Sequence, residues 1–167
     1  MEPTHKPIVD YFQGLNTKLN DFPADSFFRQ DLDEIYGAFR KGINFPCMAV
    51  ESPEGDAEES SMNNSVIGRM FAFVVYMNPK AGNFEQQNDM LDQCERIGKK
   101  LISRMRYDAR IEDNILHDRF EASSVSWVKV GPVFNEMLYG YRFSGFIKGS
   151  ESLKVDAADW EDLDLIC

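Results

Sequence analysis

Apolar residues recur with a helical period over residues 83–111, the longest patterned stretch of the chain. Their spacings of one, three and four positions place them in one stripe along one helix face. The stripe consists of Met90, Leu91, Cys94, Ile97, Leu101, Ile102 and Met105. At 1.5 Å per residue this helix would be roughly 40 Å long. The pattern predicts one long amphipathic helix that lies across a sheet.

Strand patterns stand on both sides of this helix. Before it, we predict strands at residues 43–51 and 65–77, and the second is apolar enough to be buried on both faces for part of its length. Pro46 restricts the first strand to a sheet edge or stands at its start, because proline cannot donate to a ladder. After the helix, we predict strands at 121–130 and 138–148. Neither face of residues 121–130 is purely polar, so the pattern does not decide which face meets the helix.

Two shorter helical patterns lie near the N-terminus. We predict helices at residues 7–19 and 26–40, with Asp25 or Ser26 as the cap of the second helix and Gly42 past its end. The order of elements is then helix, helix, strand, strand, long helix, strand, strand. This order predicts the α+β class, with a mainly antiparallel sheet of about four strands crossed by one long helix.

The length of 167 residues suits one domain, which we place at residues 1–150. Residues 151–167 form an acidic tail around Trp160 that is too polar for a core, so we expect a flexible or docking segment. Its acidic residues include Asp156, Asp159, Glu161, Asp162 and Asp164. The absence of a secretory leader and of an apolar run near 18 residues predicts a protein made in the cytoplasm, with no membrane partner.

Composition excludes several classes of function. Hydrophobic residues at 43% argue against a disordered protein, and a net charge of −10 argues against a general nucleic-acid binder. The three cysteines are widely spaced, which favours reduced thiols over a disulfide framework. Cys94 and His117 could form a nucleophile pair, but Cys94 lies on the apolar stripe and is better explained as an inert core thiol. We find no nucleophile, base or metal-ligand set, so we expect no enzyme, no metal and no cofactor.

Aromatic residues follow the last two predicted strands. Trp127, Tyr139, Tyr141 and Phe143 could stack on nucleotide bases. Aromatic residues on paired strands more often pack into a core, and we favour that role here.

Charge is distributed unevenly along the chain. Residues 52–64 contain acidic but no basic residues and are predicted to form a mobile loop. Together with the residue before it, this loop gives a candidate acidic surface that comprises Glu51, Glu54, Asp56, Glu58 and Glu59. Basic residues instead gather on the long helix, where the candidate subunit interface comprises Arg96, Lys99, Lys100 and Arg104. Separated charges of opposite sign suit subunits that meet acid to base. Ordinary surface charge with intrahelical pairing, such as Glu95 with Lys99, explains the same pattern, and both interpretations stay open.

Over residues 7–148, the element order resembles that of the neck and tail-completion proteins of tailed bacteriophages, the tail-terminator group. Two short segments resemble proteins from phages and prophages of Bacteroidota. They are Val130-Gly131-Pro132-Val133-Phe134 and Tyr139-Gly140-Tyr141-Arg142-Phe143. Residues 151–167 have no counterpart in this resemblance.

The resemblance implies a structural virion protein that forms a homo-oligomeric ring at the tail end or the head–tail junction. Such a ring would be hexameric or twelve-fold, would contact tail-tube or neck proteins, and would meet DNA only as passing cargo. In such rings a long hairpin loop faces the lumen or the next ring, so the acidic loop would line a channel that repels phosphate. The alternative is an acidic adaptor or inhibitor that docks on a basic partner through its tail.

Overall fold

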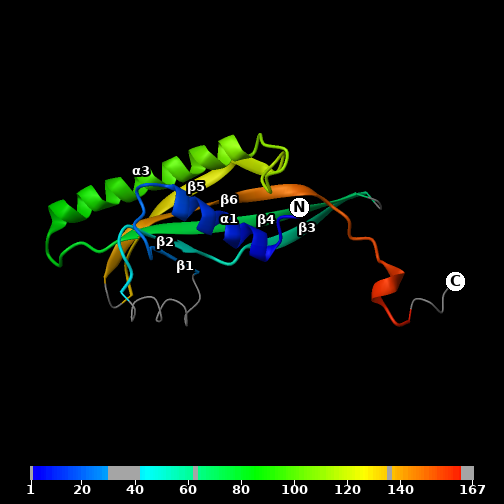
Figure 1. The fold of residues 1–167 in the computed structure, drawn as a ribbon, viewed down its shortest axis with the longest axis horizontal. Coiled ribbons are helices and arrows are strands. Elements are labelled where there is room, and N and C mark those ends of the chain that lie inside the picture. Colours follow the sequence, from blue (N-terminus) through cyan, green and yellow to red (C-terminus); the bar gives the residue numbers. More distant parts are fainter. Residues whose placement is uncertain (1, 30–41, 62–63, 135–136, 163–167) are drawn as a thin grey trace.

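The computed structural model describes residues 2–29, 42–61, 64–134 and 137–162. In these residues, helix α3 (Phe84–Asp108) lies along one face of a six-stranded sheet (Figure 1). Its N-cap is Asn83, whose side chain accepts a hydrogen bond from the Gln86 backbone N–H. The predicted apolar stripe faces the sheet. Its buried members are Leu91, Cys94, Ile97, Leu101 and Met105. The prediction of a long amphipathic helix is confirmed.

The sheet has the order β1–β2–β4–β6–β5, and β3 pairs with β4 beside β2. The strands are β1 (Phe27–Arg29), β2 (Cys47–Val50), β3 (Glu54–Ser61), β4 (Asn64–Met77), β5 (Phe120–Val133) and β6 (Leu138–Glu151). β1 and β2 are parallel, whereas the other pairs are antiparallel. The α+β class is confirmed, but the sheet is mixed and has six strands rather than about four.

Strand β4 is the central strand of the sheet. β6 pairs with one edge of β4 from Ser65 to Met77. On the other edge, β3 pairs with the first half of β4 and β2 pairs with the second half. Every residue from Phe71 to Met77 is buried. The predicted burial on both faces is therefore confirmed for this half of the strand, because helices cover one face and a second apolar cluster covers the other.

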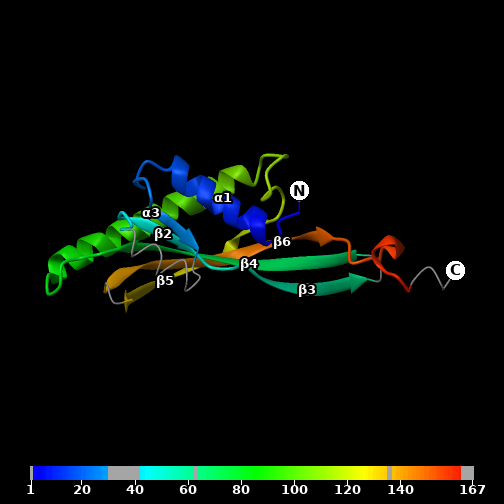
Figure 2. The same ribbon diagram turned by 60° about the horizontal axis from the view of Figure 1, so that its bottom comes forward.

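Helix α1 (His5–Lys18) lies on the same face of the sheet as α3 (Figure 2). The prediction of a helix at residues 7–19 is confirmed. Phe12 anchors α1, since its ring centre lies 5.6 Å from that of Phe71 and 5.4 Å from that of Phe73. These contacts place α1 over the centre of β4.

An aromatic row runs across β4, β6 and β5 beneath α3. The ring centre of Phe143 lies 5.2 Å from that of Phe73 and 5.9 Å from that of Trp127. Gly98 of α3 rests directly on Phe143. The face of β5 that carries Trp127 is therefore the one that meets α3, a question that the sequence pattern left open. Phe143 is fully buried, which supports the core role for this residue, whereas Trp127 is 42% exposed.

A smaller apolar cluster lies on the opposite face of the sheet. Its buried residues are Phe28, Cys47, Ala49, Val74, Tyr76 and Leu138. Both faces of the β1–β2–β4 corner thus contribute to the core.

Two predictions need correction. Residues 27–29, at the start of the predicted helix at 26–40, form β1, whereas the remainder of that prediction falls on residues 30–41 and lies outside the described part of the chain. Phe27 and Phe28 pack into the two clusters on opposite faces, which is the alternation of a strand and not of a helix. The predicted loop at 52–64 contains β3, whose backbone pairs with β4. Its polar sequence reflects an exposed edge strand.

Candidate functional site: an acidic arm and a basic helix face

The sheet continues past the ends of both helices as a three-stranded extension (Figure 1). We call this extension the arm; it consists of β3, residues 64–70 of β4 and residues 146–151 of β6. The backbone pairing runs without interruption from Met70 and Phe146 to Ser65 and Glu151. Glu54, Gly55, Asp56 and Ala57 of β3 are all exposed, so both faces of this edge strand meet solvent.

One charge-assisted contact lies within the arm, and a second lies beside its base. Arg69 of β4 and Glu151 of β6 form a bidentate ion pair, in which Arg69 Nη2 donates to Glu151 Oε2 at 2.8 Å. Their side chains are only 15% and 7% exposed. Arg142 and Glu51 form a second such pair, with both nitrogen–oxygen distances at 2.7 Å. This pair joins β6 to the corner between β2 and β3, and the bond to Glu51 raises the pKa of Arg142.

The five acidic residues singled out from the sequence have different environments. Glu51 is neutralised by Arg142, whereas Glu54 and Asp56 are exposed on β3. The Asp56 side chain packs over Gly68. A Cβ atom added at Gly68 would lie 2.5 Å from Asp56 Oδ1. Glu58 and Glu59 pair through their backbones with Val66 and Ser65. Glu54 and Asp56 therefore present their charge along a strand rather than on a loop.

Each of the four basic residues predicted for a subunit interface forms an ion pair within the chain. The pairs are Arg96–Asp92 at 2.7 Å, Lys99–Glu95 at 2.5 Å, Lys100–Asp21 at 2.8 Å and Arg104–Asp108 at 2.8 Å. The hydrogen bond from Lys99 lowers the pKa of Glu95. Three of the four are intrahelical pairs, so ordinary surface pairing accounts for much of this charge. All four basic side chains remain about half exposed or more, so the surface is still available for contact.

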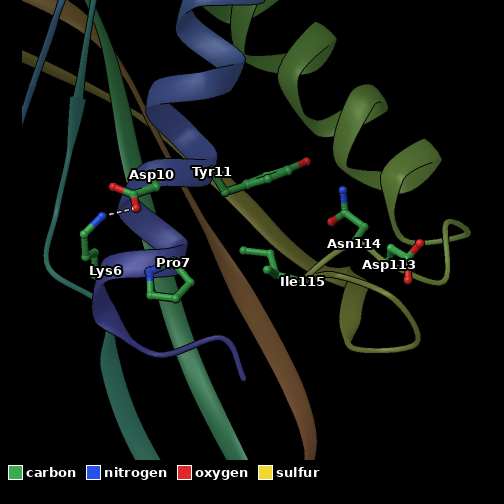
Figure 3. A pocket seen from close by; sticks show the side chains of 7 residues that line it. All are labelled: Lys6, Pro7, Asp10, Tyr11, Asp113, Asn114 and Ile115. Atoms are coloured by element: carbon green, nitrogen blue, oxygen red, sulfur yellow. Dashed lines mark hydrogen bonds and ion pairs between the residues drawn. The ribbon is translucent and has the colours of Figure 1, made fainter. Parts of the chain in front are cut away.

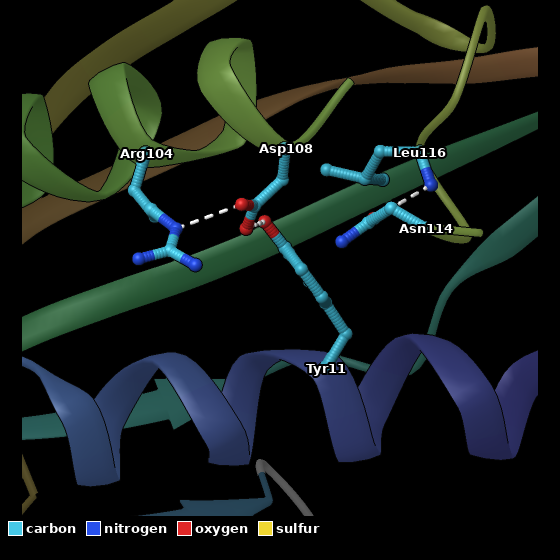
Figure 4. A network of polar contacts seen from close by, with 5 residues as sticks. All are labelled: Tyr11, Arg104, Asp108, Asn114 and Leu116. Carbon is cyan, nitrogen blue, oxygen red and sulfur yellow. Dashed lines mark hydrogen bonds and ion pairs between the residues drawn. The ribbon is translucent and has the colours of Figure 1, made fainter. Parts of the chain in front are cut away.

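A buried polar network joins α1 to the end of α3 (Figure 4). The Tyr11 hydroxyl donates to Asp108 Oδ2 at 2.9 Å, and Arg104 Nε donates to Asp108 Oδ1 at 2.8 Å. Asp108 is 2% exposed. Burial and this carboxylate raise the pKa of Tyr11 above its usual range. Sequence patterns missed this network, because nothing in the order of residues shows that residue 11 meets residue 108.

Two hollows flank α1. A cleft of about 520 Å³ lies between α1 and the segment after α3, lined by Lys6, Pro7, Asp10, Tyr11, Asp113, Asn114 and Ile115 (Figure 3). Lys6 is paired with Asp10, and the Tyr11 hydroxyl is committed to Asp108. The second hollow, which we call the helix groove, has a volume of about 110 Å³ and lies between α1 and α3. It is lined by Leu15, Lys18, Leu19, Lys100, Leu101 and Arg104.

The thiols are core groups. Cys47 and Cys94 are fully buried, and burial raises the pKa of Cys94 to about 12. His117 lies 3.6 Å from Asp118, in the segment between α3 and β5. Among the described residues, no three His, Cys, Asp or Glu side chains converge as metal ligands.

No family model matches the chain, and no curated protein matches it in sequence. Within the described residues, no helix is both long and apolar enough to cross a membrane.

Proposed function

We propose that the protein is a structural subunit that assembles with itself into a ring in the tail or neck of a phage particle. The arm is the observation that carries this proposal. Its edge strand exposes Glu54 through Ala57 on both faces, so it buries little of its own chain. Ordering a backbone residue costs roughly 1–2 kcal/mol, which a strand with so little burial offsets poorly by itself. Contact with a second subunit supplies the missing burial.

Charge on the arm supports the same proposal. Glu54 and Asp56 are exposed, and the whole chain has a net charge of −10. Repeated around a ring, these carboxylates would create a negative surface that repels phosphate. DNA would then pass such a ring as cargo without being retained.

Electron microscopy of the full-length chain, alone and mixed with the products of its neighbouring genes, tests the proposal. We expect closed rings of one symmetry or incorporation into tail or neck particles. A chain that stays monomeric and never joins a particle would refute it.

A charge-reversal variant tests the role of the arm. With Glu54→Lys and Asp56→Lys combined, the ring should retain duplex DNA at low salt, because phosphate attraction replaces repulsion. Glu112→Lys, an exposed site outside the arm, is the matched control and should leave DNA unretained. Equal DNA retention by the two variants would contradict an acidic passage.

The exposed tail supports a second candidate, an adaptor that docks on a basic partner. Leu153, Val155 and Trp160 are 59%, 65% and 57% exposed in an acidic segment. Deleting residues 152–167 retains Glu151 for its pair with Arg69 and should abolish partner binding. Unchanged partner binding by this deletion variant would count against the adaptor role.

A further inference from the structure

The helix groove combines an apolar floor with a basic rim. Leu15 and Leu101 are 5% and 1% exposed and form the floor, while Lys18, Lys100 and Arg104 contribute the rim. Its volume of about 110 Å³ is well below the 300–1,000 Å³ typical of small-molecule sites. The groove therefore suits one or two side chains of a peptide segment better than a metabolite.

The tail after β6 has the complementary composition. Residues 152–162 are all exposed and carry Asp156, Asp159, Glu161 and Asp162 against the single base Lys154. The short 3₁₀ helix η1 (Ala157–Asp159), capped by the Asp156 side chain, precedes Trp160 and presents it to solvent. A tryptophan flanked by carboxylates is a suitable anchor for an apolar groove with a basic rim, since aromatic anchors dominate many interfaces.

The tail is badly placed to reach the groove of its own chain. Phe143 lies under Gly98 of α3, one turn before Leu101, and Glu151 lies eight residues further along β6. That separation is about 27 Å at roughly 3.4 Å per residue. The nine residues from Glu151 to Trp160 span at most about 30 Å when fully extended, and η1 shortens them. The tail also leaves the molecule at the end away from α3 (Figure 1).

We propose that the acidic tail of one copy docks in the helix groove of the next copy, with Trp160 over Leu15, Leu19 and Leu101. The tail carboxylates then pair with Lys18 and share Lys100 with Asp21 and Arg104 with Asp108. Such a contact joins two different surfaces, so it is heterologous and can propagate from copy to copy. The inference rests on the proposed self-assembly and names the surfaces that produce it.

Two full-length variants separate the halves of this contact. Trp160→Ala removes the anchor and keeps the groove, whereas Lys18→Glu with Lys100→Gln alters the groove and keeps the tail. Lys6→Glu, in the neighbouring cleft, is the control for added negative charge on the helix side. Circular dichroism establishes that each variant is folded, and mass photometry measures its association.

We expect each variant alone to associate roughly tenfold or more weakly than the wild type, and the Lys6→Glu control to associate normally. The two variants mixed should form a heterodimer and nothing larger, because only one intact tail and one intact groove remain to meet. Wild-type association by either variant, a monomeric mixture, or a monomeric wild type would each overturn the inference. If the variants still form rings, the tail contact fails while the proposed ring stands. If the tail contact holds but the wild type forms open chains, the proposed ring fails instead.

Discussion

Gly98 determines how closely α3 approaches the sheet. A Cβ atom added there would overlap two ring carbons of Phe143 and lie 2.7 Å from a third, Cδ2. Phe143 cannot move aside easily, because Phe73 and Trp127 stack on it. Overpacking a rigid core costs roughly 1–3 kcal/mol, and occasionally more. The better helix propensity of alanine returns about 1 kcal/mol. Because the overlap at Gly98 is severe, we take the upper end of the overpacking range, about 3 kcal/mol, so for Gly98→Ala we expect a net loss of about 2 kcal/mol.

The matched substitution is Gly14→Ala in α1. An added Cβ at Gly14 meets nothing within 4 Å, so only the gain in helix propensity applies. We expect Gly14→Ala to stabilise the fold by about 0.5–1 kcal/mol. The same chemical change should thus have opposite signs at the two positions.

Denaturant unfolding followed by circular dichroism measures both variants against the wild type. For a chain of this size, each kcal/mol shifts the melting temperature by roughly 2–4 °C, so calorimetry gives an independent check. A Gly98→Ala variant as stable as the Gly14→Ala variant would refute the close approach of α3 to Phe143.

Other predictions concern buried polar groups. Tyr11→Phe should lower the free energy of unfolding by about 1.5–3 kcal/mol in a denaturant titration, because it removes a hydrogen bond to a buried carboxylate. The control Tyr107→Phe, at a site that is 61% exposed, should change the free energy of unfolding little. The raised pKa of Tyr11 means that the fold favours the neutral phenol, so its stabilising contribution is complete below about pH 10 and is lost as the pH rises further. Alkaline unfolding curves should accordingly be less steep for Tyr11→Phe than for the wild type, and identical curves would contradict this. Glu151→Gln should cost about 1–3 kcal/mol, because it leaves Arg69 poorly paired at a mostly buried site, and an unchanged unfolding midpoint would show that this pair does not stabilise the arm. Cys94, in a chain free of the other cysteines, should resist alkylation at pH 8 until denaturant is added, and rapid labelling of the native protein would contradict its burial.

Elements that bury a regular apolar face were predictable from the sequence. The apolar stripe of α3 and the apolar run of β4 were both recognised because their side chains are buried in the core. A hydrophobic pattern predicts an element through such burial. β3 was missed for the opposite reason. It is an edge strand with exposed polar side chains, so its sequence resembles that of a loop. Its backbone pairing with β4 does not depend on the hydrophobic pattern and could not be predicted from it.

Long-range polar contacts were also beyond the sequence patterns. The basic residues of α3 were identified, but the pairing of Lys100 depends on where Asp21 lies in space. The intrahelical pair between Glu95 and Lys99 was named in advance, because a spacing of four residues is a local property. The helix groove between α1 and α3 exists only once the two helices pack side by side.

Native mass spectrometry of the full-length chain tests the central claim most directly. The proposed ring predicts one closed oligomer whose mass is a fixed multiple of 19.2 kDa, six-fold or twelve-fold, alone or with neighbouring tail proteins. A single species at 19.2 kDa under every condition, with and without those partners, would contradict it.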